Sequence, residues 1–181
     1  YPAAYIMAMA DFKTPQVMAM LFILPMWINF LLRTIATVEL FRMFGLPLGE
    51  GALLFGMVYD FLPFMIYPIY NTLQKMDTSL IEAAHDLGAK RHQVFLKVTL
   101  PLSVPGIYSG IVMVFMPTVS TFAIAELLTH NKVTLFGSLI QRCFGEGGIA
   151  MWNYGAALSL IMLIIIGLTS FFGGDKEDIN R

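Results

Sequence analysis

Four long apolar stretches, separated by polar residues, most constrain what this chain can fold into. They cover residues 17–38, 52–70, 104–128 and 151–172. Each is close to the roughly 20 residues that an α-helix needs to cross the hydrocarbon core of a bilayer. A spanning segment must satisfy its backbone amides and carbonyls internally, because no water reaches them there. The sequence therefore predicts an all-α, multi-pass membrane protein with about four full transmembrane helices.

The composition agrees with this prediction. Of 181 residues, 57% are hydrophobic and 13% are charged, whereas soluble domains carry about 25% charged residues. The net charge of −1 says nothing about nucleic acid, and no basic cluster suggests a nucleic-acid partner. The single Cys143 has no internal disulfide partner, and we interpret it as a small apolar residue. Residues 1–10 are apolar but too short to span, so we interpret them as the end of another membrane helix.

Prolines and one arginine interrupt these stretches. Pro25 is expected to kink the first stretch, because proline removes a helical hydrogen bond. Arg33 lies near the end of the same stretch, where its long side chain is expected to reach the interface. Pro117 permits a bend in the third stretch, which either serves an alternating-access gate or is a static kink packed against its neighbours. Within the loop 129–150, apolar residues recur at helical spacing and predict a short helix; they are Val133, Phe136, Ile140, Cys143 and Phe144.

The polar interval between the second and third stretches, residues 72–101, contains strong helix and turn signals. Asp77 or Ser79 is suited to cap a short helix, and Ser79 and Glu82 have capping-box spacing. Gly88 follows, where a helix end favours a residue that accepts positive φ. A second short helix is expected after it, with Val94, Phe95 and Val98 as its apolar stripe, ending at Pro101.

The same interval carries a recognisable motif: Glu82-Ala83-Ala84, then Gly88, then Val98-Thr99-Leu100-Pro101. This pattern resembles the EAA loop of the integral-membrane permease subunits of ABC importers. Segments outside the loop are similar to the spermidine/putrescine branch of that family; they are Leu62-Pro63-Phe64-Met65, Pro68-Ile69-Tyr70, the Asp77 region, Pro105-Gly106-Ile107 and Trp152-Asn153-Tyr154-Gly155-Ala156-Ala157.

The resemblance implies a type I ABC importer permease fold, in which the loop helix sits in a cleft on the ATPase subunit. Glu82 and Gly88 take the coupling roles of the motif. The wider expected contact set is Glu82, Ala83, Ala84, Asp86, Leu87, Gly88, Ala89, Lys90, Arg91 and Pro101. Expected partners are the ATPase subunits, a second permease chain and an extracytoplasmic substrate-binding protein. No cofactor is expected in this chain, since ATP and Mg belong to the ATPase. Such permeases usually have about six spans, so residues 1–181 are expected to be one transmembrane domain that is incomplete at its N-terminus.

The basic residues predict the orientation without use of the resemblance. With the 72–101 loop in the cytoplasm, that side receives Lys13, Lys75, Lys90, Arg91, Lys97, Lys176 and Arg181. The other side receives Arg42, Lys132 and Arg142. This agrees with the positive-inside rule. It places the loop and the C-terminus in the cytoplasm of a plasma-membrane protein.

A substrate path is less sharply indicated. Asp60 lies near the middle of its stretch, where a carboxylate must face protein or a water-filled cavity. It is either part of a path for a polycation or bonded to a neighbouring helix. Glu126 is a further path candidate, but a residue at an interfacial helix end is favoured. Trp27, Tyr59, Tyr67 and Tyr108 offer aromatic faces to ammonium groups, although packing or an interfacial belt is favoured for each alone.

Other chemistry finds little support in the sequence. His85, His92 and His130 lack the spacing of a metal set, and no nucleophile–base pair stands out, so no enzyme activity is expected. Residues 145–148 lack the Lys-Ser/Thr of a phosphate loop and predict a flexible connection. The favoured function is transport of spermidine or putrescine. Alternatives are another small solute in the same class, or an ATP-independent carrier or channel, which has no reason to contain the 82–101 motif.

Overall fold

The computed structural model describes the backbone of residues 1–9, 15–130, 132–145 and 148–178. Three features of the sequence analysis lie wholly or partly outside these ranges: Lys13, Arg181 and the predicted connection at residues 145–148. All regular secondary structure within them is helical. The elements are α1 (Pro2–Met9), α2 (Pro15–Trp27), α3 (Phe30–Met43), α4 (Glu50–Gln74), α5 (Thr78–Asp86), α6 (Arg91–Val94), the π-helix η1 (Phe95–Thr99), α7 (Leu100–Ser120), α8 (Ala123–Thr129), α9 (Phe136–Gly145) and α10 (Gly148–Asp178).

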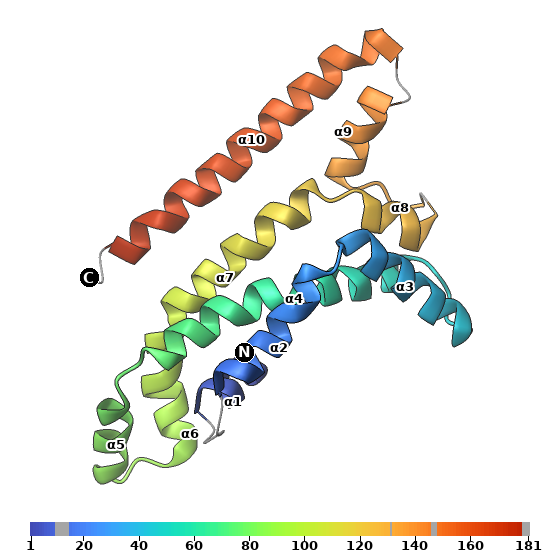
Figure 1. The fold of residues 1–181 in the computed structure, drawn as a ribbon. Helices are drawn as coiled ribbons and strands as arrows, with labels where there is room; N and C mark the ends of the chain where they lie inside the picture. The colour runs from blue at the N-terminus through green and yellow to red at the C-terminus, as the bar shows by residue number, and fades with distance from the viewer. Residues whose placement is uncertain (10–14, 131, 146–147, 179–181) are drawn as a thin grey trace.

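Three described helical segments are long and apolar enough to cross a bilayer: Glu50–Gln74, Arg91–Ser120 and Met151–Phe171. A fourth span results if α2 and α3, which meet at a bend of 95°, are counted as one broken span. These observations confirm the predicted all-α, multi-pass architecture. Figure 1 shows α4 and α7 side by side in the middle, with α10 running back beside α7 in the opposite direction.

The break in the first apolar stretch lies beyond Pro25, contrary to the expectation of a kink at that residue. Pro25 stays inside α2, and the helix ends at Trp27. The Asn29 side chain then caps α3 by accepting the amide hydrogen of Leu31 at 2.9 Å. An amide-capped helix start is a stable break, because it satisfies a donor that the interrupted helix leaves free.

The sequence predicted that the second helix of the polar interval ends at Pro101, but the helix continues through this residue. The chain passes from α6 through η1 directly into α7, and Pro101 lies in the first turn of α7. The amide of Leu100 bonds to the carbonyl of Phe95, which is a π-type turn. Proline lacks an amide hydrogen and its ring crowds the preceding turn. The wider π turn accommodates it without a break.

The third and fourth stretches also differ from their expected bounds. α7 ends at Ser120, Thr121 is extended, and the separate helix α8 follows, so residues 104–128 are not one span. α9 confirms the predicted short helix at Phe136, Ile140, Cys143 and Phe144, whereas Val133 lies before its start. α10 begins before residue 151 and continues to Asp178, beyond the predicted end at 172. Likewise, α3 and α4 extend into the interval between the first two apolar stretches, since α3 ends at Met43 and α4 begins at Glu50.

α4 is the central helix, and glycine allows α7 to approach it closely. A Cβ atom built on Gly106 would lie 2.4 Å from Thr72 Oγ1 and 3.0 Å from the carbonyl oxygen of Pro68. One built on Gly110 would lie 2.8 Å from Met65 Sδ. Small residues four apart are a common device for close helix contact in membranes. The Gly106-x-x-x-Gly110 spacing was present in the sequence and is a signal that our sequence analysis did not use.

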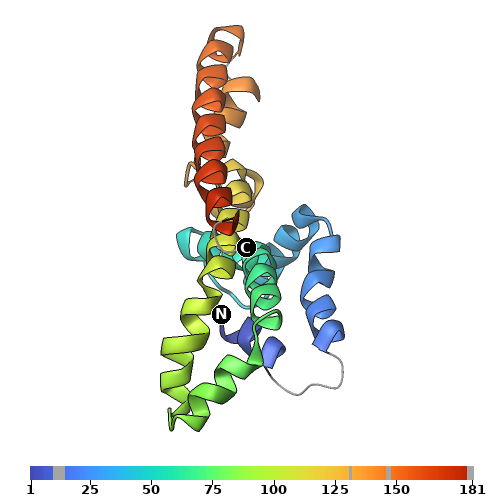
Figure 2. The same cartoon turned by 90° about the vertical axis from the view of Figure 1, so that its left-hand side faces the viewer.

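Two buried clusters hold the ends of α4. At its C-terminal end, Ile66, Ile69, Tyr70 and Leu73 pack on Ala4 and Met7 of α1. At its N-terminal end, Ala52 and Leu53 pack on Val38 of α3 and on Ile124, Ala125 and Leu128 of α8. Figures 1 and 2 show that α5 and α6 form a helical hairpin that extends from the end of the molecule nearest α1.

Candidate coupling helix and buried ion pair

The N-terminus of α5 is capped by Asp77, one of the two residues that the sequence offered for this position. Its carboxylate accepts the amide hydrogen of Ser79 at 2.9 Å. This hydrogen bond holds the pKa of the Asp77 carboxyl below its usual value. The ionised cap therefore stabilises α5 above the ordinary pKa of an aspartate. The stabilisation is lost only as the pH falls through the lowered pKa.

The C-terminus of α5 has a complete glycine cap. Gly88 has a φ of +79°, and its amide bonds to the carbonyl of His85 at 2.8 Å. The amide of Ala89 bonds to the carbonyl of Ala84 at 3.1 Å. These two hydrogen bonds form a Schellman motif, in which the residue after the C-cap adopts the left-handed conformation. Glycine adopts this conformation without a steric penalty. The positive φ predicted for Gly88 is confirmed.

Most of the hairpin surface is exposed. In the predicted contact set, Ala84 and Ala89 are half-buried and the other eight residues are exposed, Leu87 by 89%. Leu80 is also exposed, whereas Ile81 and Ala84 are half-buried, so only part of the apolar surface of α5 faces the protein. Glu82, Asp86, Lys90 and Arg91 form no ion pair with any described residue. Charged and apolar side chains are thus both available for a partner.

The hairpin leans on the bundle across an incompletely filled interface. A cavity of about 330 Å³ lies between α1, α5, α6 and η1. Ile81 and His85 line it from α5, and Phe95 lines it from η1. On the α1 side, Tyr1 and Tyr5 meet the Phe95 ring edge to face, at centroid distances of 5.7 and 5.5 Å. α1 therefore braces η1, whereas α5 has few buried contacts.

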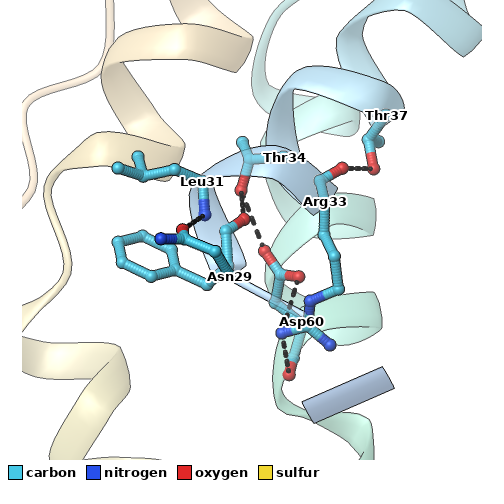
Figure 3. Close-up of polar contacts among 7 residues, drawn as sticks. Asn29, Leu31, Arg33, Thr34, Thr37 and Asp60 are labelled. Atoms are coloured by element: carbon cyan, nitrogen blue, oxygen red, sulfur yellow. Dashed lines mark hydrogen bonds and ion pairs between the residues drawn. The ribbon is translucent and has the colours of Figure 1, made fainter. Parts of the chain in front are cut away.

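The second polar site is a buried ion pair between α3 and α4, drawn in Figure 3. Asp60 is 1% exposed and Arg33 is 7% exposed. Arg33 Nη2 lies 3.1 Å from Asp60 Oδ1 and donates to the Asp60 carbonyl oxygen at 3.4 Å. The hydroxyl of Thr34 donates to Asp60 Oδ2 at 3.1 Å. The prediction that Arg33 extends to the interface is wrong, because a buried carboxylate holds it inside.

The sequence left two interpretations of Asp60: part of a path for a polycation, or a carboxylate bonded to a neighbouring helix. The ion pair with Arg33 is the arrangement of the second interpretation. The guanidinium also lies 5.8 Å from the centroid of the Tyr59 ring. Sequence reasoning missed Arg33 as the partner, since nothing in a one-dimensional pattern relates residues 33 and 60. A lone arginine and a lone aspartate in two apolar stretches are the signal that pairing could have used.

The remaining path candidates do not gather around Asp60 in this chain. Trp27 is 86% exposed at the end of α2, and Glu126 is exposed on α8. Tyr59 and Tyr67 lie on α4 with 43% of their surface exposed. Tyr59 contacts the ion pair, whereas Tyr67, Trp27 and Glu126 form no hydrogen bond, ion pair or ring contact with it in the part of the chain that the structure describes. Their place along a path stays a prediction.

Helices long and apolar enough to span a membrane, joined by an exposed hairpin whose helix α5 is capped at both ends, define a multi-pass membrane protein. Residues 1–174 match the family described as "Binding-protein-dependent transport system inner membrane component". The chain belongs to this family, which confirms the resemblance found in the sequence.

Individual relatives agree with this membership. The chain is 34% identical to the spermidine/putrescine transport system permease protein PotB of Escherichia coli (strain K12), with 93% of the chain and 66% of the relative covered. It is also 34% identical to PotB of Haemophilus influenzae, covering 94% of the chain and 65% of the relative. The chain thus spans just under two thirds of the length of these relatives.

A solved structure has the same fold. A chain of the MetNI methionine ABC transporter in inward-facing conformations superposes with a TM-score of 0.71 at 20% identity. The match covers 96% of this chain and 82% of that one. It confirms the predicted permease fold.

Proposed function

We propose that this chain is a transmembrane permease subunit of an ATP-driven ABC importer that carries spermidine or putrescine. The exposed, doubly capped helix α5 carries the proposal, together with the likeness to polyamine permeases. The two caps satisfy backbone groups that the ends of a helix leave free, which helps an exposed helix to stay formed and suits an element that docks in a groove of another protein. Nucleotide binding and hydrolysis belong to a separate ATPase subunit, and this chain needs no cofactor of its own.

The proposed partners follow from the same features. α5 and α6 face the cytoplasm and contact the ATPase through Glu82, Gly88 and the residues around them. α10 is largely exposed along an apolar surface, which suits lipid or a second permease chain. The opposite end of the molecule, with α8 and α9, faces an extracytoplasmic binding protein. ATPase closure moves α5, which lies against α6 and η1. The movement then passes into α7, because α6, η1 and α7 form one continuous helix.

Transport itself tests the proposal. The chain, assembled with its partner permease and ATPase in proteoliposomes, is expected to take up labelled putrescine when both binding protein and ATP are present. Uptake that persists without ATP would indicate a carrier or channel instead. Uptake of another solute, with none of putrescine or spermidine, would leave the transporter class intact and reject the cargo.

Two variants of Gly88 test whether α5 couples the ATPase to transport. Gly88→Val places a β-branched residue at positive φ, which is unfavourable, whereas Gly88→Asn is tolerated there. A Cβ atom at this position would meet nothing within 4 Å, so the difference reports the backbone and not a clash. We expect Gly88→Val to lower putrescine-stimulated ATP hydrolysis and uptake at normal membrane insertion, and Gly88→Asn to retain most of both.

Equal activity of the two Gly88 variants would contradict the coupling role of the glycine cap. Glu82→Lys adds an independent test, because it reverses a charge on the exposed surface of α5 without touching the fold. It is expected to reduce co-purification with the ATPase. Unchanged co-purification and uptake in Glu82→Lys would remove Glu82 from the interface.

A further inference from the structure

The residues of α4 around Asp60 form a complete site for a cation, and a side chain of the same protein occupies it. The site consists of the Asp60 carboxylate, the Asp60 backbone carbonyl and the face of the Tyr59 ring. The Arg33 guanidinium lies 3.1 Å from the carboxylate oxygen Oδ1, 3.4 Å from the carbonyl oxygen and 5.8 Å from the ring centroid (Figure 3 shows the two oxygen contacts). A carboxylate, a carbonyl and an aromatic face are groups that also bind alkylammonium ions.

The ion pair is poorly satisfied for a purely structural one. Arg33 Nε and Nη1 are buried and find no hydrogen-bond acceptor among the residues that the structure describes. Asp60 Oδ1 is within ion-pair distance of Nη2 but receives no hydrogen bond. Buried charged groups without all their partners are held at a cost. Because the unsatisfied nitrogens are buried within this chain, a partner subunit cannot supply their acceptor without a rearrangement.

The guanidinium also has a way out of the site. It lies against the Tyr59 ring, and 43% of the Tyr59 surface is exposed. Tyr59 stacks on Phe55 with centroids 6.4 Å apart, and Phe55 is half exposed. Aromatic faces of this kind stabilise a cation that has lost some of its water. The rings of Tyr59 and Phe55 thus link the position of the guanidinium to the exposed surface of α4.

We propose that Arg33 is a tethered stand-in for the cargo: it fills the Tyr59–Asp60 cation site when the path is empty, and an ammonium group of the cargo displaces it during transport. The proposal rests on the proposed function and adds the binding group and its competitor. Exchange of one cation for another keeps Asp60 neutralised throughout, which matters because a bare carboxylate in the membrane interior is costly. The site accepts alkylammonium ions and discriminates against neutral or anionic solutes.

The exchange sets the apparent affinity. When a binding-competent state is populated only as a fraction, the apparent dissociation constant rises by the inverse of that fraction. Minor states commonly have populations of about 0.1–10%. Removal of Arg33 from the site should therefore tighten amine binding by about tenfold or more, whereas a structural pair would lose stability and gain no affinity.

The test uses the full complex in proteoliposomes, with putrescine uptake measured across a concentration series. Arg33→Gln removes the competing charge and is expected to lower the KM for putrescine by about tenfold or more. Arg33→Lys is the matched control, because its ammonium group still pairs with Asp60, and its KM should stay near that of the wild type. Arg33→Gln should also gain more thermal stability from added putrescine than the wild type does, and none from 1,4-butanediol.

The double variant Arg33→Gln/Asp60→Asn guards against a single variant that fails to assemble, because it replaces both charges by neutral groups of similar shape. The proposal predicts normal assembly but a KM for putrescine raised by about tenfold or more, since the anion of the site is gone. A KM unchanged in the double variant, or unchanged in an assembled Arg33→Gln, would overturn the exchange and leave polyamine transport standing. Absence of putrescine uptake by the wild-type complex would instead reject the proposed function itself.

Discussion

The two polar regions of this molecule differ in where their charges find partners. On α5, Glu82 and Asp86 are exposed and unpaired, and the ends of the helix are satisfied by residues within three positions of them. In the α3–α4 pair, Arg33 and Asp60 are buried and meet across 27 positions of sequence. The first region is organised locally, and the second exists only because two helices pack together.

This difference has an energetic counterpart. Exposed charges contribute little to stability, typically about 0–1 kcal/mol even when paired, so α5 is free to use them for a partner. Breaking a buried pair by removing one member costs about 3–5 kcal/mol. The comparison therefore assigns recognition between proteins to α5 and internal constraint to the α3–α4 pair.

The largest effect that would sharpen this comparison is expected from Arg33→Ala. It leaves Asp60 buried without its counter-ion and should destabilise the fold by about 3–5 kcal/mol. Arg91→Ala is the matched control, because Arg91 is exposed and forms no ion pair with the described residues. Apparent melting temperatures in detergent measure both. Similar losses in the two variants would break the distinction between the regions.

A medium effect is expected where α7 approaches α4. Gly106→Ala would place its Cβ atom 3.0 Å from the backbone oxygen of Pro68, which cannot rotate away as the Thr72 hydroxyl can. We expect a destabilisation of about 1–3 kcal/mol. Gly51→Ala in α4 meets nothing within 4 Å and should be neutral or slightly stabilising. Thermal unfolding of the two variants under the same conditions checks this, and equal melting temperatures would show that the α4–α7 contact is looser than described.

The smallest effect is expected at the N-terminal cap of α5. Asp77→Ala removes the acceptor for the Ser79 amide, whereas Asp77→Asn keeps an acceptor of similar shape. Hydrogen exchange at the first-turn amides of α5 should be modestly faster in Asp77→Ala and nearly unchanged in Asp77→Asn at pH 7. The lowered pKa of Asp77 means that the wild-type cap weakens only in strong acid. Identical exchange in all three proteins would show that α5 does not depend on this cap.

The sequence predicted the local features of the coupling helix well. Asp77 was one of two proposed caps, and Gly88 was expected at positive φ, because these signals act over three or four residues. Bounds set by proline were predicted less well. Pro25 and Pro101 both lie within helical elements, since an asparagine cap at Asn29 and a π turn before Pro101 decided where the chain breaks and where it continues.

By itself, the sequence determined that the chain crosses a membrane as helices, which permease family it belongs to, and which short helix lies exposed with both ends capped. The length of an apolar stretch and the capping of a helix depend on residues that are neighbours in the chain, so both can be recognised in the sequence. Only the tertiary structure decided that Arg33 neutralises Asp60 and that Gly106 lets α7 approach α4 closely. Those contacts join residues far apart in sequence, and they arise from the way in which α3, α4 and α7 pack.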